Sequence, residues 1–366
     1  MKKSFIISGA IIIFCLLVNI TARLWTGFAD FYVRNIFPFF SNIFSFLSGL
    51  FSFSVGEVFL FLLAIFIIIG IPAIFVILIR RKNSRKKVLK IYTSIALFII
   101  TFAVFSETFN CFIMYQCTPF SNIYFNESER SREQLTELYS VLVDETNKLA
   151  EQVERDSEGN FKITCDMNEE AKKAMKKMGE KYPQFKGYYP DPKPIKTSYI
   201  MSQTRTLGIY FPFTMEANYN PSVYESNLPN TVCHEFSHLK GIILEDEAGF
   251  FAFVACIQSD NIEFQYSGYL NALEYVSNEI YKNNISEAFE ISQKISEKTS
   301  QDMYKFVPEE FWEENKDKEI ISSETIGKVS DNFTDTNLKI NGVEDGIQSY
   351  SRIVNLLLDY YFGGEK

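Results

Sequence analysis

Histidine is nearly absent from this sequence, with only two in 366 residues. Both lie in one short stretch, as His234 and His238, and Glu235 follows the first of them. Two histidines scattered at random would fall four residues apart in roughly one chain in 180, and would also have a glutamate after the first in on the order of one in 2,000. The scarcity therefore makes an incidental pair a poor explanation.

The spacing of the two histidines has a chemical meaning on a helix. Residues four apart lie one turn apart on the same face, so His234 and His238 can reach one small ion together. Neutral imidazole is a favoured ligand of zinc. Glu235 lies beside a ligand, where it can reach a metal-bound water without itself binding the metal. The stretch predicts a zinc site with an adjacent general base.

Acidic residues are scarce in the first third of the chain. Residues 1–110 carry 11 Lys+Arg and 3 Asp+Glu, a balance of +8, whereas the remainder has a balance of −17. A basic, apolar segment followed by an acidic, polar one predicts a membrane anchor joined to a soluble domain. The acidic domain argues against nucleic acid as a partner.

Cysteine is also used sparingly. The six cysteines form no CxxC pair and have no spacing of the zinc-finger type, which argues against a cysteine-ligated metal site. Cys111 and Cys117 are close enough to be considered for a disulfide outside the cell, and the sequence leaves that pairing open. Cys233 precedes a proposed ligand, but a cysteine there is usually a small hydrophobic residue.

Three apolar runs in the first third are long enough to cross a bilayer. They are residues 4–22, 58–79 and 88–108, and they define a membrane anchor over 1–109 followed by a soluble domain over 110–366. Residues 35–56 are also uncharged and rich in phenylalanine, but Pro38, Gly49 and several serines interrupt them. We expect this segment to lie in the membrane interface or to be re-entrant.

A basic run decides the predicted orientation. Residues 80–87, RRKNSRKK, separate the second and third spans, and such loops remain in the cytoplasm. Three crossings then place the N-terminus inside and residues 110–366 outside. We therefore expect a multi-pass protein of the cell membrane with an extracytoplasmic domain.

The soluble domain reads as mostly helical. Helices are expected within 126–156 and at 166–180, 230–240, 246–259, 266–283, 286–298, 308–317 and 346–362. Residues 197–203 and 206–220 are rich in β-forming side chains, so the expected class is mostly α with a small antiparallel β-sheet. A strand before the histidine helix could present a free edge to an extended peptide, or could simply cover the helix.

A catalytic zinc site needs a third protein ligand. Gly241 can end the histidine helix and turn the chain back, which brings Glu245, Asp246 and Glu247 into consideration. Three acids at the start of a helix are also common partners of its dipole. The residues alone leave the three candidates open.

The chain resembles a family of bacterial membrane proteins catalogued as a domain of unknown function, with an HExxH motif after three membrane helices. The likeness is densest over GIYFPFTMEANYN, LPNTVCHEFSHLKGIILEDEAGFFAFVAC and YSGYL, and the family's Asn is replaced here by Gly249. The segment EAGFFA also resembles the Glu-Ala-x-x-Phe-Ala of gluzincin-type metallopeptidases, whose glutamate binds zinc. That resemblance implies a gluzincin-like domain with Glu247 as the third ligand.

The function that follows is zinc-dependent hydrolysis of peptide bonds. The substrate would be a peptide or a protein, and the lipid bilayer is the other expected partner. Glu235 would act as general base, and Tyr266 and Arg205 are the leading candidates to stabilise the oxyanion, ahead of Tyr269 and Arg352. The alternative is a catalytically silent zinc protein with a structural or signalling role. An intramembrane protease is excluded because residues 220–245 are too polar for a span.

Overall fold

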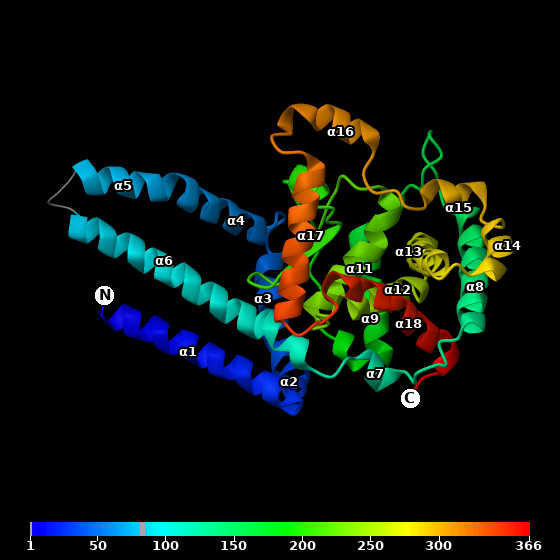
Figure 1. The fold of residues 1–366 in the computed structure, drawn as a ribbon, viewed down its shortest axis with the longest axis horizontal. Coiled ribbons are helices and arrows are strands. Elements are labelled where there is room, and N and C mark those ends of the chain that lie inside the picture. The colour runs from blue at the N-terminus through cyan, green and yellow to red at the C-terminus, as the bar shows by residue number, and fades with distance from the viewer. Residues whose placement is uncertain (1, 81–84) are drawn as a thin grey trace. The chain divides into compact units, whose positions relative to one another are not determined.

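The computed structural model describes residues 2–80 and 85–366, and it is mostly helical (Figure 1). The chain divides into two compact units. The first comprises Met1–Cys117 and Phe211–Glu216, and the second comprises Thr118–Tyr210 and Ala217–Lys366. Each unit is described separately below.

Three helical segments of the first unit are long and apolar enough to cross a membrane. They are Lys3–Leu24, Val55–Arg80 and Arg85–Gln116. They contain α1 (Lys2–Leu24), α4 (Val55–Ile65), α5 (Ile71–Arg80) and α6 (Arg85–Glu107). Three apolar helices that could span a membrane thus lie where the spans were predicted, and their crossing of a bilayer is still an expectation. The orientation stays a prediction, and residues 81–84 of the basic run on which it rests lie outside the described residues.

The segment predicted to lie in the membrane interface, residues 35–56, is mostly helical. A first helix, α2 (Thr26–Phe31), is continued by a π-helical turn, η1 (Tyr32–Ile36), and by α3 (Phe37–Gly49). This continuous helical stretch, residues 26–49, is not among the described segments that are long and apolar enough to cross a membrane. It buries Ser41, Ser45 and Ser48 and exposes phenylalanines on its other side, which is compatible with the predicted interfacial position.

A hairpin tip from the middle of the chain belongs to the first unit. The Glu216 carboxylate accepts hydrogen bonds from the backbone N–H groups of Val55 and Gly56, at 3.0 and 2.7 Å. These groups lie at the start of α4, where an α-helix has unsatisfied N–H groups and favours negative charge. Glu216 therefore caps this apolar helix, a role that the predicted division at residues 109 and 110 did not foresee.

The core of the second unit is a set of packed helices. It contains α8 (Arg132–Ala150), α9 (Met167–Lys181), α11 (Leu228–Leu239), α12 (Glu245–Ile257) and α13 (Ile262–Lys282). Helix α12 packs against both α11 and α13, and α8 packs along α13. Five of the phenylalanines that fill this core are fully buried, namely Phe236, Phe250, Phe251, Phe253 and Phe264. The helices expected in these regions are confirmed.

Most of the remaining helices are short, and the longest of those given next, α17, was not predicted. They are α7 (Ser121–Tyr124), α14 (Phe289–Ser292), α15 (Glu297–Asp302), α16 (Glu309–Asn315), α17 (Ser323–Ile340) and α18 (Ile353–Leu358), with a 3-10 helix η10 (Gly346–Arg352). The helix expected over 286–298 is broken into short pieces. Helix α17 escaped prediction because its apolar Val329 and Phe333 are exposed and only Gly327 and Leu338 are buried.

A small sheet precedes α11, the helix that carries His234 and His238. Its strands are β1 (Lys193–Pro194), β2 (Gly208–Phe211) and β3 (Glu216–Tyr219), in the order β1-β3-β2. β1 runs parallel to β3, with Lys193 opposite Asn218, so the sheet is mixed and the prediction of an antiparallel sheet was wrong in that respect. The strand expected at 197–203 is instead helix α10 (Ser198–Gln203), whose last three residues are buried.

Candidate metal centre

The histidine helix ends in a tight turn that brings the next helix back. Gly241 has φ +89°, a conformation that glycine adopts without strain. Its N–H binds the carbonyl of His238, and the N–H of Ile242 binds the carbonyl of Ser237. This is the left-handed cap expected at Gly241. Helix α12 then begins at Glu245, close to the two histidines.

Two imidazoles and one carboxylate converge at this turn. Glu245 Oε2 lies 3.1 Å from His234 Nε2 and 3.6 Å from His238 Nε2. The three ligand atoms lie within 4.8 Å of one another, and no other such group of three appears among the described residues. Because two nitrogens and one oxygen are the donors that catalytic zinc sites use, the set can hold a metal ion.

The surroundings of His238 orient its ring. Its Nδ1 lies 2.7 Å from the Ile242 carbonyl, which leaves Nε2 facing Glu245. Burial lowers the pKa of His238, but the Glu245 carboxylate opposes it and the pKa rises to about 9. Burial raises the pKa of Glu245, but the two imidazoles outweigh burial and hold that pKa well below its usual range. The carboxylate thus stays ionised, whereas the His238 ring carries a proton that a bound metal ion would displace.

Glu247, the third ligand favoured by resemblance, binds backbone groups in this structure. Its carboxylate accepts hydrogen bonds from the backbone N–H groups of Phe120, at 3.0 Å, and Ser121, at 2.6 Å. Burial raises the pKa of Glu247 to about 7, against these hydrogen bonds, which lower it. Within the described residues Glu247 is not part of the ligand group. The structure thus places Glu245 beside the histidines, whereas the Glu247 carboxylate accepts hydrogen bonds from the backbone at the start of α7.

Glu235 is buried beside the ligand group. Its Oε2 has no hydrogen-bond partner among the described residues, and burial raises its pKa to about 7. Gly208 of β2 lies against it, because a Cβ at that position would be 2.5 Å from Glu235 Oε1. An unpartnered buried carboxylate oxygen is costly in a folded protein. Its presence next to a His-His-Glu group fits a site that holds a metal ion and water.

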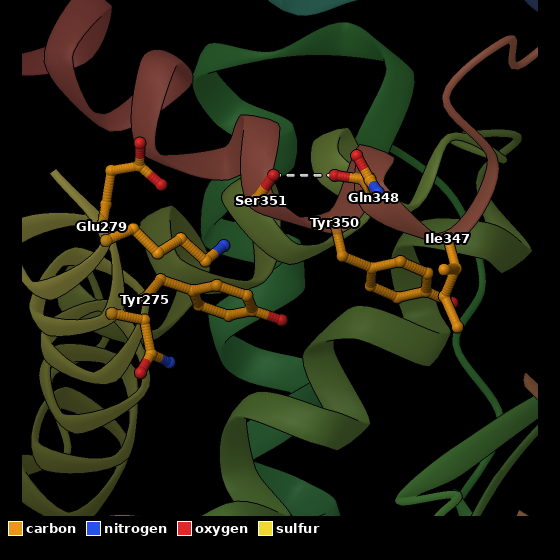
Figure 2. A pocket seen from close by; sticks show the side chains of 8 residues that line it. Tyr275, Glu279, Ile347, Gln348, Tyr350 and Ser351 are labelled. Carbon is orange, nitrogen blue, oxygen red and sulfur yellow. Dashed lines mark hydrogen bonds between the residues drawn. The ribbon is translucent and has the colours of Figure 1, made fainter. Parts of the chain in front are cut away.

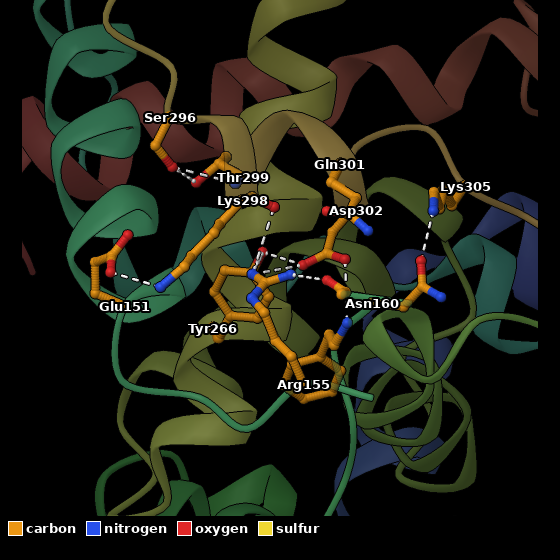
Figure 3. Close-up of polar contacts among 12 residues, drawn as sticks. Glu151, Arg155, Asn160, Tyr266, Ser296, Lys298, Thr299, Gln301, Asp302 and Lys305 are labelled. Atoms are coloured by element: carbon orange, nitrogen blue, oxygen red, sulfur yellow. Dashed lines mark hydrogen bonds and ion pairs between the residues drawn. The ribbon is translucent and has the colours of Figure 1, made fainter. Parts of the chain in front are cut away.

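Tyr266, a predicted oxyanion donor, lies in a buried network of polar side chains. Its side chain is fully buried, and its hydroxyl donates to Asp302 Oδ2 at 2.6 Å. Asp302 also forms an ion pair with Arg155 at 3.0 Å (Figure 3). Burial and the Asp302 charge raise the pKa of Tyr266 well above its usual value. The hydroxyl is committed to this buried network, so the structure gives Tyr266 a structural place.

The other predicted donors lie in different environments. Arg205 is exposed in a turn with φ +57°, and its Nε would be 3.4 Å from a Cβ at Gly327 of α17. Tyr269 packs its ring against Phe253 in the core. Arg352 is the cation beside the site, since its Nε lies 3.0 Å from an oxygen of Asp246, the residue after Glu245.

Tyr275 of α13 was missed by the sequence interpretation. Burial, followed by the charges of Glu245 and Glu274, raises the pKa of Tyr275 to about 12. The phenol therefore stays protonated, and the Glu245 charge contributes to that. Its hydroxyl makes no hydrogen bond within the described part of the chain. No motif or periodicity distinguishes Tyr275 from the other tyrosines of α13.

Fold and site together describe a mostly helical protein with three apolar helices that could span a membrane and a His-His-Glu group able to hold a metal. Residues 32–358 match the family described as protein of unknown function (DUF3810), and the chain belongs to that family. No curated protein and no solved structure matches the chain.

Proposed function

We propose that this protein is a membrane-bound, zinc-dependent hydrolase of peptide bonds. The observation that carries the proposal is the convergence of His234, His238 and Glu245 next to the buried, unpartnered carboxylate of Glu235. The likeness to gluzincins supports the same class, with Glu245 taking the place of Glu247. The basic run at 80–87 supports an extracytoplasmic domain, which protease added to intact cells would remove.

Glu235 is suited to the proton transfers of the reaction. Zinc bound by the three ligands would polarise the scissile carbonyl and make a water molecule more acidic. Glu235 takes the proton of the attacking water and passes it to the leaving amine. A carboxyl group in this buried position is placed to accept a proton and then release it.

Strand β2 is the surface on which an extended substrate would lie. It is an edge strand of the sheet, and Gly208 brings its backbone against Glu235. A peptide that pairs with an edge strand is held by main-chain hydrogen bonds, which are independent of its sequence. Gly208 is needed there, because a side chain would press on the general base.

Tyr275 replaces Tyr266 as the proposed oxyanion donor. Tyr275→Phe removes one hydroxyl, so kcat/KM should fall about 100-fold while zinc content is unchanged. The matched control is Tyr281→Phe, on the same helix, where the residue is 84% exposed. Peptide hydrolysis and metal analysis of both variants measure the difference. A Tyr275→Phe enzyme as fast as wild type would remove this role.

The experiment that tests the function uses the full chain purified in detergent and loaded with zinc. An equimolar library of synthetic hexapeptides is incubated with it, and new peptide termini are identified by mass spectrometry. Cleavage should stop after chelation and return when zinc is added back. A library left intact by a folded, zinc-loaded protein would count against the proposal.

A further inference from the structure

A pocket of about 550 Å³ lies between α13 and η10 (Figure 2). Its volume is within the range of small-molecule and peptide sites. Its polar lining includes Tyr275, Asn278, Glu279 and Lys282 of α13 and Gln348 and Ser351 of η10. The Ser351 hydroxyl donates to the Gln348 carbonyl at 2.7 Å, which fixes the η10 wall.

The two elements that wall this pocket also pack against the helix that carries Glu245. Both α13 and η10 contact α12, which begins at Glu245. Arg352, the residue after Ser351, lies with its Nε 3.0 Å from an oxygen of Asp246, so the end of η10 is joined to the start of α12. This packing makes the pocket the candidate continuation for a substrate bound at His234, His238 and Glu245.

The length of the pocket follows from its α13 wall. Tyr275, Asn278, Glu279 and Lys282 are spaced three, four and seven residues apart, so they form one stripe along the helix. At a rise of 1.5 Å per residue, Lys282 lies about 10 Å from Tyr275 along the axis. That length corresponds to about three residues of extended peptide.

The chemistry of the lining favours an anion at the far end. Lys282 makes no ion pair or hydrogen bond among the described residues, and the side-chain amides of Asn278 and Gln348 are likewise unused. Of the lining residues only Glu279 is acidic, and one of its carboxylate oxygens accepts a hydrogen bond from Asn283 at 2.7 Å. An ammonium group beside amide donors is a suitable partner for a carboxylate.

We propose that this pocket holds the C-terminal end of a peptide substrate, with the terminal carboxylate at Lys282. This proposal rests on the hydrolase function. If the pocket holds the C-terminal end, the enzyme releases peptides of two or three residues. Hydrolysis breaks the amide C–N bond, and the hydroxyl of water goes to the acyl carbon. The remaining proton goes to the amine of the released peptide.

The test compares hexapeptide libraries that differ only at the C-terminus, as free carboxylate or as carboxamide. Binding is measured by equilibrium dialysis with zinc-loaded full-length Glu235→Gln protein, in which the peptides persist. The free acids should bind about tenfold more tightly than the amides, as a charge-assisted hydrogen bond predicts. Lys282→Met should abolish this preference, and Lys162→Met, an exposed lysine of the same unit, should preserve it.

The wild-type protein supplies the second measurement, the length of the released products. Dipeptides and tripeptides from the free acids, with little release from the amides, support the pocket. Preferential binding of free acids that Lys282→Met removes, without any hydrolysis, supports the pocket and refutes the hydrolase. Hydrolysis of acids and amides at equal rates, or a preference that survives Lys282→Met, overturns the pocket and leaves the hydrolase standing.

Discussion

Replacing Glu245 by alanine should abolish stoichiometric zinc binding by the full chain, whereas Glu247→Ala should leave it intact. Among the residues that the structure describes, Glu245 Oε2 is the carboxylate oxygen that lies beside both histidine Nε2 atoms. Removal of one of three ligands should weaken zinc binding by on the order of 100-fold or more, since even second-shell changes cost 10- to 100-fold. Metal analysis after dialysis against a weak chelator measures the difference.

Stability measurements separate ligation from folding. Glu247→Ala leaves the N–H groups of Phe120 and Ser121 without their carboxylate acceptor, so we expect it to lower thermal stability. Glu245→Ala removes a half-buried carboxylate, so circular dichroism should show a folded protein that lacks zinc. Stoichiometric zinc in Glu245→Ala together with its loss from folded Glu247→Ala would return the third ligand to Glu247.

Glu235→Gln should lower peptide hydrolysis by on the order of 100-fold or more while zinc content stays at the wild-type level. Glutamine has nearly the same shape, and both histidines remain, so the ligand group should be unchanged. What is lost is the acceptor of the water proton, and a positioned acid–base group commonly contributes 10²–10⁴ in rate. Hexapeptide hydrolysis and metal analysis on the same preparations check both halves of the prediction.

Two controls accompany that substitution. His238→Ala should lose zinc as well as activity, since it removes a ligand and not only a proton acceptor. Gly327→Ala adds a Cβ where contacts are ordinary, at 3.4 Å and beyond, and should leave both properties unchanged. Full activity in zinc-loaded Glu235→Gln would show that another group acts as base.

The third ligand shows where sequence interpretation reached its limit. The motif, the turn at Gly241 and the return of the next helix were all predicted from residue types. The choice between Glu245 and Glu247 depended on where α12 begins and how it is rotated. Residues two apart on a helix point about 200° apart, so only one of the two can face the histidines. Periodicity does not fix helix starts to within one residue.

The position of Tyr275 escaped the sequence interpretation for a related reason. Tyr266 and Tyr275 are nine residues apart on α13, which places them on opposite sides of the helix. One side meets the buried Arg155–Asp302 network, and the other lines the pocket between α13 and η10. Which side is which follows from the packing of α8 and α12 on α13, a tertiary property that one helix sequence does not contain.

The apolar anchor was the most predictable part, because length and hydropathy alone define helices that can cross a membrane. The cap that Glu216 gives to α4 was not predictable, since it joins groups 160 residues apart. The strand predicted over residues 197–203 was wrong. A composition rich in β-forming residues does not exclude a six-residue helix whose end is buried by its neighbours.

The most direct measurement of the central claim compares the peptide termini of membrane-associated and secreted proteins from cells that make wild-type protein or Glu235→Gln. Both N-termini and C-termini are mapped, because release of two or three residues creates new C-termini. We predict a set of termini that appears with wild type and is missing with Glu235→Gln at equal protein and zinc content. Identical maps from the two cell lines would contradict the hydrolase and favour a catalytically silent zinc protein.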